Sequence, residues 1–249
     1  GVVRWLEQQG IGMDVGFGHP LPLVPAAVLF DLPVGDALIR PDADGGFAAC
    51  AAASVSPLVC GNVGAGAGAS VGKLFGSNCA MKGGIGSASV QLHGVTVGAL
   101  VACNAVGDVL DPHTGQLLAG ARTAADQLRL RDTQRALLQG DAPRFALPGT
   151  NTTIGIIATD AALSRTELQR LTVAGHDGLA RCIRPVHTML DGDTLFALST
   201  AQAQQQPDLI TLSAMAAEAV QLAVLCAVRA AQTLRVGELW LPAAAELSA

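Results

Sequence analysis

Tyrosine is absent from this chain, and aromatic residues of any kind are scarce: six phenylalanines and two tryptophans make up 3% of its 249 residues. Half of the residues are nevertheless hydrophobic, so the core must be built from alanine, valine, leucine and isoleucine. Small aliphatic side chains let elements approach closely, which suits layers of sheets and helices. The length favours one large domain over residues 1–249.

Basic residues are also few: 15 lysines and arginines stand against 20 acidic residues, for a net charge of -5. A protein that binds a phosphate backbone needs a basic patch, so nucleic acid is excluded as an expected partner. The six cysteines are scattered, without CxxC pairs or histidines at ligand spacing, and so indicate neither a zinc site nor a dense disulfide framework. We therefore expect no metal, reduced thiols and a cytoplasmic location.

No segment has the composition of a membrane span. The most apolar stretch, residues 214–228, carries Glu218 and Gln221 and is followed by Arg229. Polar side chains within a stretch this short predict a buried helix, and we expect no contact with a membrane. The chain opens with an amphipathic helix at 2–9, not with a basic region followed by an apolar run, which suggests a truncated or processed N-terminus.

Several segments have clear secondary-structure patterns. Residues 87–92 and 95–104 alternate with period two around a tight His93-Gly94 turn, which predicts a hairpin. Ser164 and Glu167 match a capping box at the start of a helix that runs to about Cys182. Further strands are expected at 26–32, 152–159 and 194–200, and a long helix at 212–234.

The glycine-rich segment 61–73 invites a nucleotide-binding interpretation, which the residues do not support. Lys73 follows Gly72 as in a P-loop, but Ala67 replaces the leading glycine and Leu74 replaces the serine or threonine that would hold magnesium. The dinucleotide pattern GxGxxG does not fit either. We predict no cofactor, and we expect other backbone or a ligand to lie close to this segment.

The Asn151-Thr152-Thr153 sequence is open to three interpretations. It is formally an N-glycosylation acceptor, which would place it on the surface of a secreted protein. It also fits the threonine-rich start of a buried strand. The third interpretation is chemical: Thr152 could be a nucleophile.

Six segments together carry a resemblance to a known family. They are GNVGAGAGASVGK, KGGIGSAS, TVGALVACNAVGDV, GTNTTIGIIATDA, GHDGLARCIRPVHT and DGDTLFALST. In collinear order, from Gly1 to about Ala230, the chain resembles the DmpA-type aminopeptidases, a family that also includes the nylon-oligomer hydrolases. The resemblance implies an α/β fold, a four-layer αββα sandwich, and homo-oligomers such as a tetramer of processed units.

The resemblance further implies that an inactive precursor cleaves itself between Asn151 and Thr152. The products would be an α chain of residues 1–151 and a β chain of residues 152–249. Thr152 would then be both the nucleophile and the carrier of the base, because a free α-amine with a pKa of about 7.7 to 8.0 accepts a proton that an amide nitrogen cannot.

Four more site residues follow from local matches to the family. Asn104 would donate an N–H to the developing oxyanion, and Lys73 would stabilise negative charge or tune the nucleophile. Asp191 and Asp193 would orient the Thr152 hydroxyl and hold the ammonium form of its amine. Taken alone, this DxD pattern is also typical of a solvated turn.

Three features depart from the family or stand outside the assigned set. A tyrosine assists in some members at the position of Phe30, which here would shape the pocket without donating a hydrogen bond. The segment that normally precedes the equivalent of Gly1 is expected to be missing. His176 and His187 each stand alone at their local spacing, and we interpret them as ordinary buried histidines and not as ligands or bases.

The resulting functional prediction is hydrolysis of a short peptide or a related small amide through an acyl-Thr152 ester. One alternative is an acyltransferase like the ornithine acetyltransferases, which share the fold and the terminal threonine. Another is a binding protein that keeps the fold and is never cleaved.

Overall fold

The computed structural model of the chain describes residues 1–16, 18–143, 150–205 and 207–248. The chain divides into two compact units, residues 1–28 with 36–58 and residues 29–35 with 59–249, and each is described by itself. The second unit contains every residue assigned to the site from the sequence.

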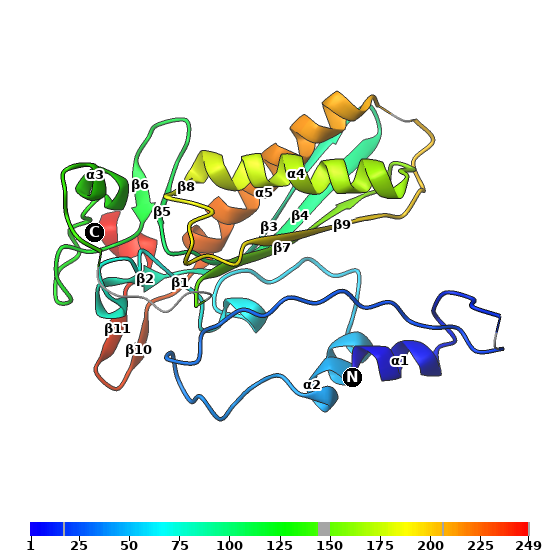
Figure 1. Ribbon diagram of the computed structural model, residues 1–249, viewed down its shortest axis with the longest axis horizontal. Helices are drawn as coiled ribbons and strands as arrows, with labels where there is room; N and C mark the ends of the chain where they lie inside the picture. Colours follow the sequence, from blue (N-terminus) through cyan, green and yellow to red (C-terminus); the bar gives the residue numbers. More distant parts are fainter. Residues whose placement is uncertain (17, 144–149, 206, 249) are drawn as a thin grey trace. The chain divides into compact units, whose positions relative to one another are not determined.

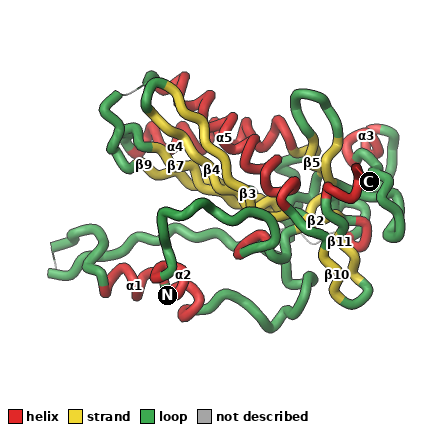
Figure 2. The backbone as a smooth tube through the Cα atoms, turned by 180° about the vertical axis from the view of Figure 1, so that it is seen from behind, coloured by secondary structure: helices red, strands yellow, loops and turns green. Residues whose placement is uncertain are grey.

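The first unit consists of two short helices joined by loops (Figure 2). They are α1 (Val2–Gln8) and α2 (Ala43–Ala51), and α2 begins where the Asp42 side chain accepts a hydrogen bond from the Gly45 amide. An ion pair of 2.7 Å joins Arg4 of α1 to Asp44 of α2. A surface ion pair thus links the two helices, and a side-chain cap fixes the start of α2.

The strand expected at residues 26–32 is wrong, because these residues form no regular element. Val28, in the middle of the run, is 81% exposed. A strand needs a neighbouring strand to receive its backbone hydrogen bonds, and an apolar run alone does not supply one.

The second unit holds the remaining elements. Its helices are α3 (Thr133–Leu138), α4 (Arg165–Cys182) and α5 (Leu209–Ala230), with short 3-10 turns at η1 (Gly64–Gly66), η2 (Ser77–Cys79) and η3 (Ala244–Ser248). Its strands are β1 (Ser70–Val71), β2 (Met81–Lys82), β3 (Gly84–Leu92), β4 (Val95–Asn104), β5 (Asp108–Leu110), β6 (Leu117–Ala119), β7 (Thr152–Thr159), β8 (Ile183–Arg184), β9 (Thr194–Ser199), β10 (Leu234–Val236) and β11 (Leu239–Leu241).

The main sheet has the order β3-β4-β7-β9. The predicted hairpin is confirmed as β3 and β4, which pair antiparallel around His93 and Gly94. β7 pairs antiparallel with β4 and parallel with β9. The first residue of β7 therefore lies next to the last residue of β4 and the turn that precedes β9.

Helices α4 and α5 lie side by side over one face of this sheet (Figure 1). Alternate residues of β4, such as Val97 and Val101, are fully buried against them. Glycines let the layers approach closely: a Cβ added to Gly86 of β3 would lie 2.2 Å from a carbonyl oxygen of α5, and one added to Gly178 of α4 would lie 2.3 Å from another. The predicted α/β class is confirmed, and these layers are one α and one β layer of the expected sandwich.

The expected apolar helix is α5, which runs from residue 209 to 230, not from 212 to 234. Among the described residues it is the one helix long and apolar enough to cross a membrane by length and composition, and 56% of its most apolar window is buried within the fold. Its contacts with α4, β3 and β4 explain that burial.

The glycine-rich segment is packed against other backbone. A Cβ on Gly66 would lie 2.3 Å from the Ile85 amide, and one on Gly72, whose φ is +74°, would lie 2.0 Å from the Ala121 amide. The Lys82 ammonium group is fully buried and donates to the carbonyl oxygens of Gly66 and Ala69 at 2.7 and 2.8 Å. The expectation that backbone lies close to this segment is confirmed.

A smaller sheet, β6-β5-β8, carries a buried acid. The Asp108 carboxylate accepts hydrogen bonds from the Ala121 amide at 2.7 Å and from the amide and hydroxyl of Thr133 at 2.6 and 2.7 Å. Burial raises the pKa of Asp108 to about 6, against the opposing effect of these donors. The carboxylate thus joins β5 to the start of α3.

The two tryptophans belong to different units. Trp5 lies in α1, whereas Trp240 lies in β11 with the guanidinium groups of Arg122 and Arg235 at 4.6 and 4.8 Å from its ring centre. Arg122 is buried and also donates to the Trp240 carbonyl oxygen at 3.0 Å.

Candidate active site

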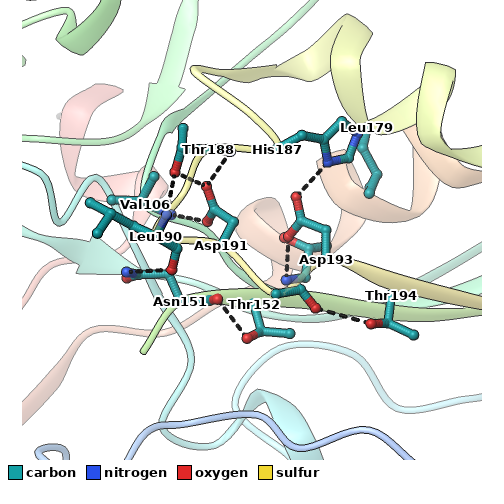
Figure 3. Close-up of polar contacts among 12 residues, drawn as sticks. Val106, Asn151, Thr152, Leu179, His187, Thr188, Leu190, Asp191, Asp193 and Thr194 are labelled. Carbon is teal, nitrogen blue, oxygen red and sulfur yellow. Dashed lines mark hydrogen bonds and ion pairs between the residues drawn. The ribbon is translucent and has the colours of Figure 1, made fainter. Parts of the chain in front are cut away.

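Three segments of the second unit meet where the candidate site lies (Figure 3). Asn104 at the end of β4 is the register partner of Thr152 at the start of β7. Asn151 forms a parallel bridge with Asp191, in the turn that leads into β9. The sheet thus brings Asn104, Asn151, Thr152 and Asp191 together from distant parts of the sequence.

Thr152 is poised beside the peptide bond that precedes it. Its side chain is buried, and its hydroxyl donates a hydrogen bond of 2.5 Å to the carbonyl oxygen of Asn151. The backbone amide of Gly192 donates to the same oxygen at 2.8 Å. The Asn151 side chain is held as well, since its Nδ2 donates to the Leu190 carbonyl oxygen at 3.3 Å.

The Asn104 amide is oriented by its neighbours. Its Oδ1 accepts from the Ser70 amide at 3.1 Å and from the Lys73 ammonium group at 2.7 Å. Both donors require an acceptor, so they fix which end of the amide is oxygen. The donor end, Nδ2, is directed at the carbonyl oxygen of Phe30 at 3.0 Å.

Lys73 has an unusual charge state. Its Nζ donates to both the backbone and the side-chain oxygen of Asn104, and burial lowers its pKa from 10.5 to about 7. The carboxylates of Asp191 and Asp31 act in the opposite direction. Burial thus favours the neutral amine, and the two carboxylates favour the ammonium form.

The two carboxylates of the DGD sequence are fixed by different partners. Asp191 accepts from the Val106 amide at 3.1 Å and from the Thr188 hydroxyl at 2.6 Å, and burial, with a further contribution from the Asp193 charge, raises its pKa. Asp193 accepts from the Thr153 amide at 2.8 Å. Neither carboxylate is bonded to the Thr152 hydroxyl, which is engaged with Asn151, and the roles expected for them stay predictions.

His187 lies beside the candidate site, where the sequence analysis did not place it. Its Nδ1 lies 2.8 Å from Asp193 Oδ2, and 38% of its side chain is exposed, so its interpretation as a buried histidine is wrong. Its backbone adopts the left-handed region, with φ of 53°, which is uncommon outside glycine. The His176 ring contacts it edge-on at 4.9 Å, and burial lowers the pKa of His176. The two histidines are eleven residues apart in sequence, a spacing with no local signature.

A cavity of about 380 Å³ opens beside the site. Phe30, Lys73, Asn104 and Asn151 line it, so Phe30 is placed at the pocket as expected. Asp31, which the sequence analysis did not single out, also lines it. The described residues contain no group of three or more histidine, cysteine or acidic side chains placed to hold a metal ion.

The comparisons with known proteins converge on one family. The model of peptidase family S58 matches residues 1–238. An uncharacterized aminopeptidase of Mycobacterium tuberculosis is 48% identical over 214 residues, which cover 84% of this chain and 59% of the relative. A 6-aminohexanoate-oligomer endohydrolase of Paenarthrobacter ureafaciens is 34% identical over 188 residues, covering 74% of this chain and 52% of the relative. The chain thus spans less than two thirds of the length of either relative.

Two solved structures show the fold. A Burkholderia beta-aminopeptidase has a TM-score of 0.63 at 24% identity, over 99% of this chain and 69% of that one. The L-aminopeptidase D-Ala-esterase/amidase of Ochrobactrum anthropi, described as a variant of the Ntn-hydrolase fold, has a TM-score of 0.53 at 24% identity, over 76% and 51% of the two chains. The layered sheets and helices of this chain are therefore of the Ntn-hydrolase type.

Proposed function

Because the chain belongs to peptidase family S58, we propose that it is a self-processing amide hydrolase whose nucleophile is Thr152. The observation that carries the proposal is the contact between the Thr152 hydroxyl and the carbonyl oxygen of Asn151, buried within the sheet and opposite Asn104. Attack by this hydroxyl on the Asn151 carbonyl carbon forms an ester and frees the Thr152 amine. Water then hydrolyses the ester and separates residues 1–151 from 152–249.

In the processed enzyme the freed α-amine accepts the proton of the Thr152 hydroxyl as that oxygen attacks a substrate carbonyl. A threonine hydroxyl is a weak nucleophile without such a base. Asn104 Nδ2 donates to the oxyanion that develops, and Lys73 holds the other end of the same amide. Nδ2 donates to the Phe30 carbonyl oxygen in the free protein, and the substrate oxygen replaces this acceptor when substrate binds.

The substrate class follows from the cavity. A volume of about 380 Å³ is at the lower end of the range for small-molecule sites and fits a short peptide or a small amide. The carboxylate of Asp31 on its wall is suited to a substrate that carries an ammonium group. Aminopeptidase and aminohexanoate-oligomer substrates, which the names of the two relatives specify, both have this group.

The first experiment compares the intact masses of the freshly purified full-length chain, of Thr152→Ala and of Thr153→Ala. We expect two fragments that break between Asn151 and Thr152 in the unmodified chain and in Thr153→Ala, and a single chain in Thr152→Ala. Thr153 is the matched control, because it neighbours the nucleophile but its buried hydroxyl has no hydrogen-bond partner among the residues that the structure describes. An unmodified chain that stays whole on long incubation would overturn the proposal.

The second experiment tests the reaction of the processed enzyme. Release of p-nitroaniline from alanine p-nitroanilide is expected, and added ornithine should not divert the acyl group from water. Preferential transfer to the amine would favour an acyltransferase. We also propose a homo-oligomer, such as a tetramer of processed units, which light scattering would test, and a cytoplasmic location, which cell fractionation would test.

A further inference from the structure

The carbonyl oxygen of Asn151 receives a second hydrogen bond, from the backbone amide of Gly192 at 2.8 Å. By register this bond extends the parallel ladder between β7 and β9, whose far end carries the equivalent bond from the Thr200 amide to the Thr159 carbonyl oxygen at 2.9 Å. The two bonds have the same geometry in the ladder. Only the first one involves the carbonyl that the nucleophile contacts.

Immediately beyond this carbonyl, side chains replace backbone groups as the hydrogen-bond partners in the ladder. The Thr153 amide donates to the Asp193 carboxylate at 2.8 Å, and the Gly192 carbonyl oxygen accepts from the Thr194 hydroxyl at 3.0 Å. Asp191, on the other side of Gly192, is held by Val106 and Thr188. Fixed carboxylates thus flank Gly192 and anchor its peptide on both sides.

A side chain at position 192 would crowd the nucleophile. A Cβ at this position would lie 3.1 Å from Thr152 Oγ1 and 3.8 Å from the Asn151 oxygen, closer to the hydroxyl than most real contacts. Gly192 is not among the glycines with positive φ, so its backbone conformation alone does not require glycine. The missing side chain leaves the nucleophile room beside the carbonyl it attacks.

Asn104 is less well placed for the same carbonyl. Its donor atom, Nδ2, is directed at Phe30 on the wall of the cavity, whereas the Asn151 oxygen accepts from Thr152 and Gly192. Before cleavage, the donors at the Asn151 oxygen are thus Thr152 and Gly192, whereas Asn104 Nδ2 is engaged by a residue of the cavity wall.

We propose that the backbone amide of Gly192 is the oxyanion donor of self-cleavage, separate from Asn104, which serves substrate hydrolysis. This inference rests on the proposed function. As the bond from Thr152 Oγ1 to the Asn151 carbon forms, the carbonyl π electrons move to the oxygen that the Gly192 N–H already contacts. The carbon–nitrogen bond then breaks, and the hydroxyl proton ends on the new amine. Water later adds across the ester, restores the hydroxyl and leaves an Asn151 carboxylate.

The test removes one N–H without changing a side chain. Suppression of a nonsense codon in cell-free synthesis places glycolic acid at position 192, which replaces the amide by an ester. The matched control places the α-hydroxy analogue of threonine at position 200, where an equivalent ladder bond is lost far from the nucleophile. Cleavage into residues 1–151 and 152–249 is followed by intact mass over time, and thermal unfolding is recorded for both esters.

We expect the ester at position 192 to slow self-cleavage by roughly 100-fold or more, as loss of one oxyanion donor does in other enzymes, and the ester at position 200 to slow it less than threefold. Equal effects of the two esters, or no effect of the first, would overturn the inference while leaving the proposed function intact. Loss of cooperative unfolding in the first ester alone would also overturn it, since the N–H would then be structural. If the unmodified chain does not cleave, the proposed function itself fails.

Discussion

Replacing Asn104 with aspartate changes one group of the site while preserving its shape. Oδ1 remains to accept from the Ser70 amide and the Lys73 ammonium group, at 3.1 and 2.7 Å in the unmodified chain. Nδ2, which in the unmodified chain is a donor directed at the cavity, is replaced by a carboxylate oxygen, an acceptor with partial negative charge. The substitution therefore removes the proposed oxyanion donor, together with its bond to the Phe30 carbonyl oxygen, and keeps the two contacts to Oδ1.

The size of the effect follows from two contributions. Loss of one preorganised donor costs about 3 kcal/mol of transition-state stabilisation, or a factor of about 100 in rate. A carboxylate facing a developing oxyanion adds repulsion, which the neighbouring Lys73 partly offsets because an acidic partner favours its charged form. We expect kcat/KM to fall by about 1,000-fold.

The assay measures hydrolysis of alanine p-nitroanilide and divides the rate by the amount of released 152–249 fragment, so that incomplete processing does not imitate a catalytic defect. Asn62→Asp is the matched control, because Asn62 also bonds through both ends of its amide, here to the exposed backbone of Gln232. It should change the rate less than twofold. A fall of less than threefold in Asn104→Asp would show that this amide does not stabilise the oxyanion.

Two further predictions concern stability, and both use the uncleaved Thr152→Ala background. Asp108→Ala leaves three buried donors without an acceptor, and at about 1 to 3 kcal/mol for each unsatisfied group we expect urea unfolding to show a loss of at least about 3 kcal/mol. Asp177 is exposed, so Asp177→Ala should change the free energy of unfolding by no more than about 0.5 kcal/mol. Similar losses in Asp108→Ala and Asp177→Ala would refute the argument that the buried donors need the Asp108 carboxylate. Burial lowers the pKa of Lys73 to about 7 from 10.5, so between these values the unfolded chain binds more protons and the free energy of unfolding should rise with pH. Lys73→Met should reduce this rise in the free energy of unfolding by a few kcal/mol. An unchanged dependence of stability on pH would contradict the burial of the Lys73 amine.

Local signals in the sequence predicted the elements around the site well. The β-branched run at 152–159 has the same bounds as β7, and the capping box at Ser164 marks the start of α4, where both of its hydrogen bonds are formed. Both signals involve interactions between residues close in sequence. The strand expected at 26–32 is wrong because its formation depended on a partner strand that the sequence pattern could not supply.

The sequence predicted some residues of the candidate site but not the contacts between them. Motif resemblance proposed Thr152, Asn104, Lys73 and both acids, and the structure brings these residues to one place. The contact of His187 with Asp193 and the position of Asp31 on the cavity depend on turns whose geometry has no periodic pattern. The Gly192 contribution is a backbone amide, which residue identity does not reveal.

The scarcity of aromatic residues gives the protein two optical reporters, one in each unit. Without tyrosine, near-ultraviolet fluorescence arises almost entirely from Trp5 in one unit and Trp240 in the other. The guanidinium groups of Arg122 and Arg235 both contact the Trp240 ring, so its emission will respond to any loosening of β11. Replacing either tryptophan with phenylalanine leaves a single fluorophore, and the melting of each unit can then be followed on its own, before and after the chain is cut.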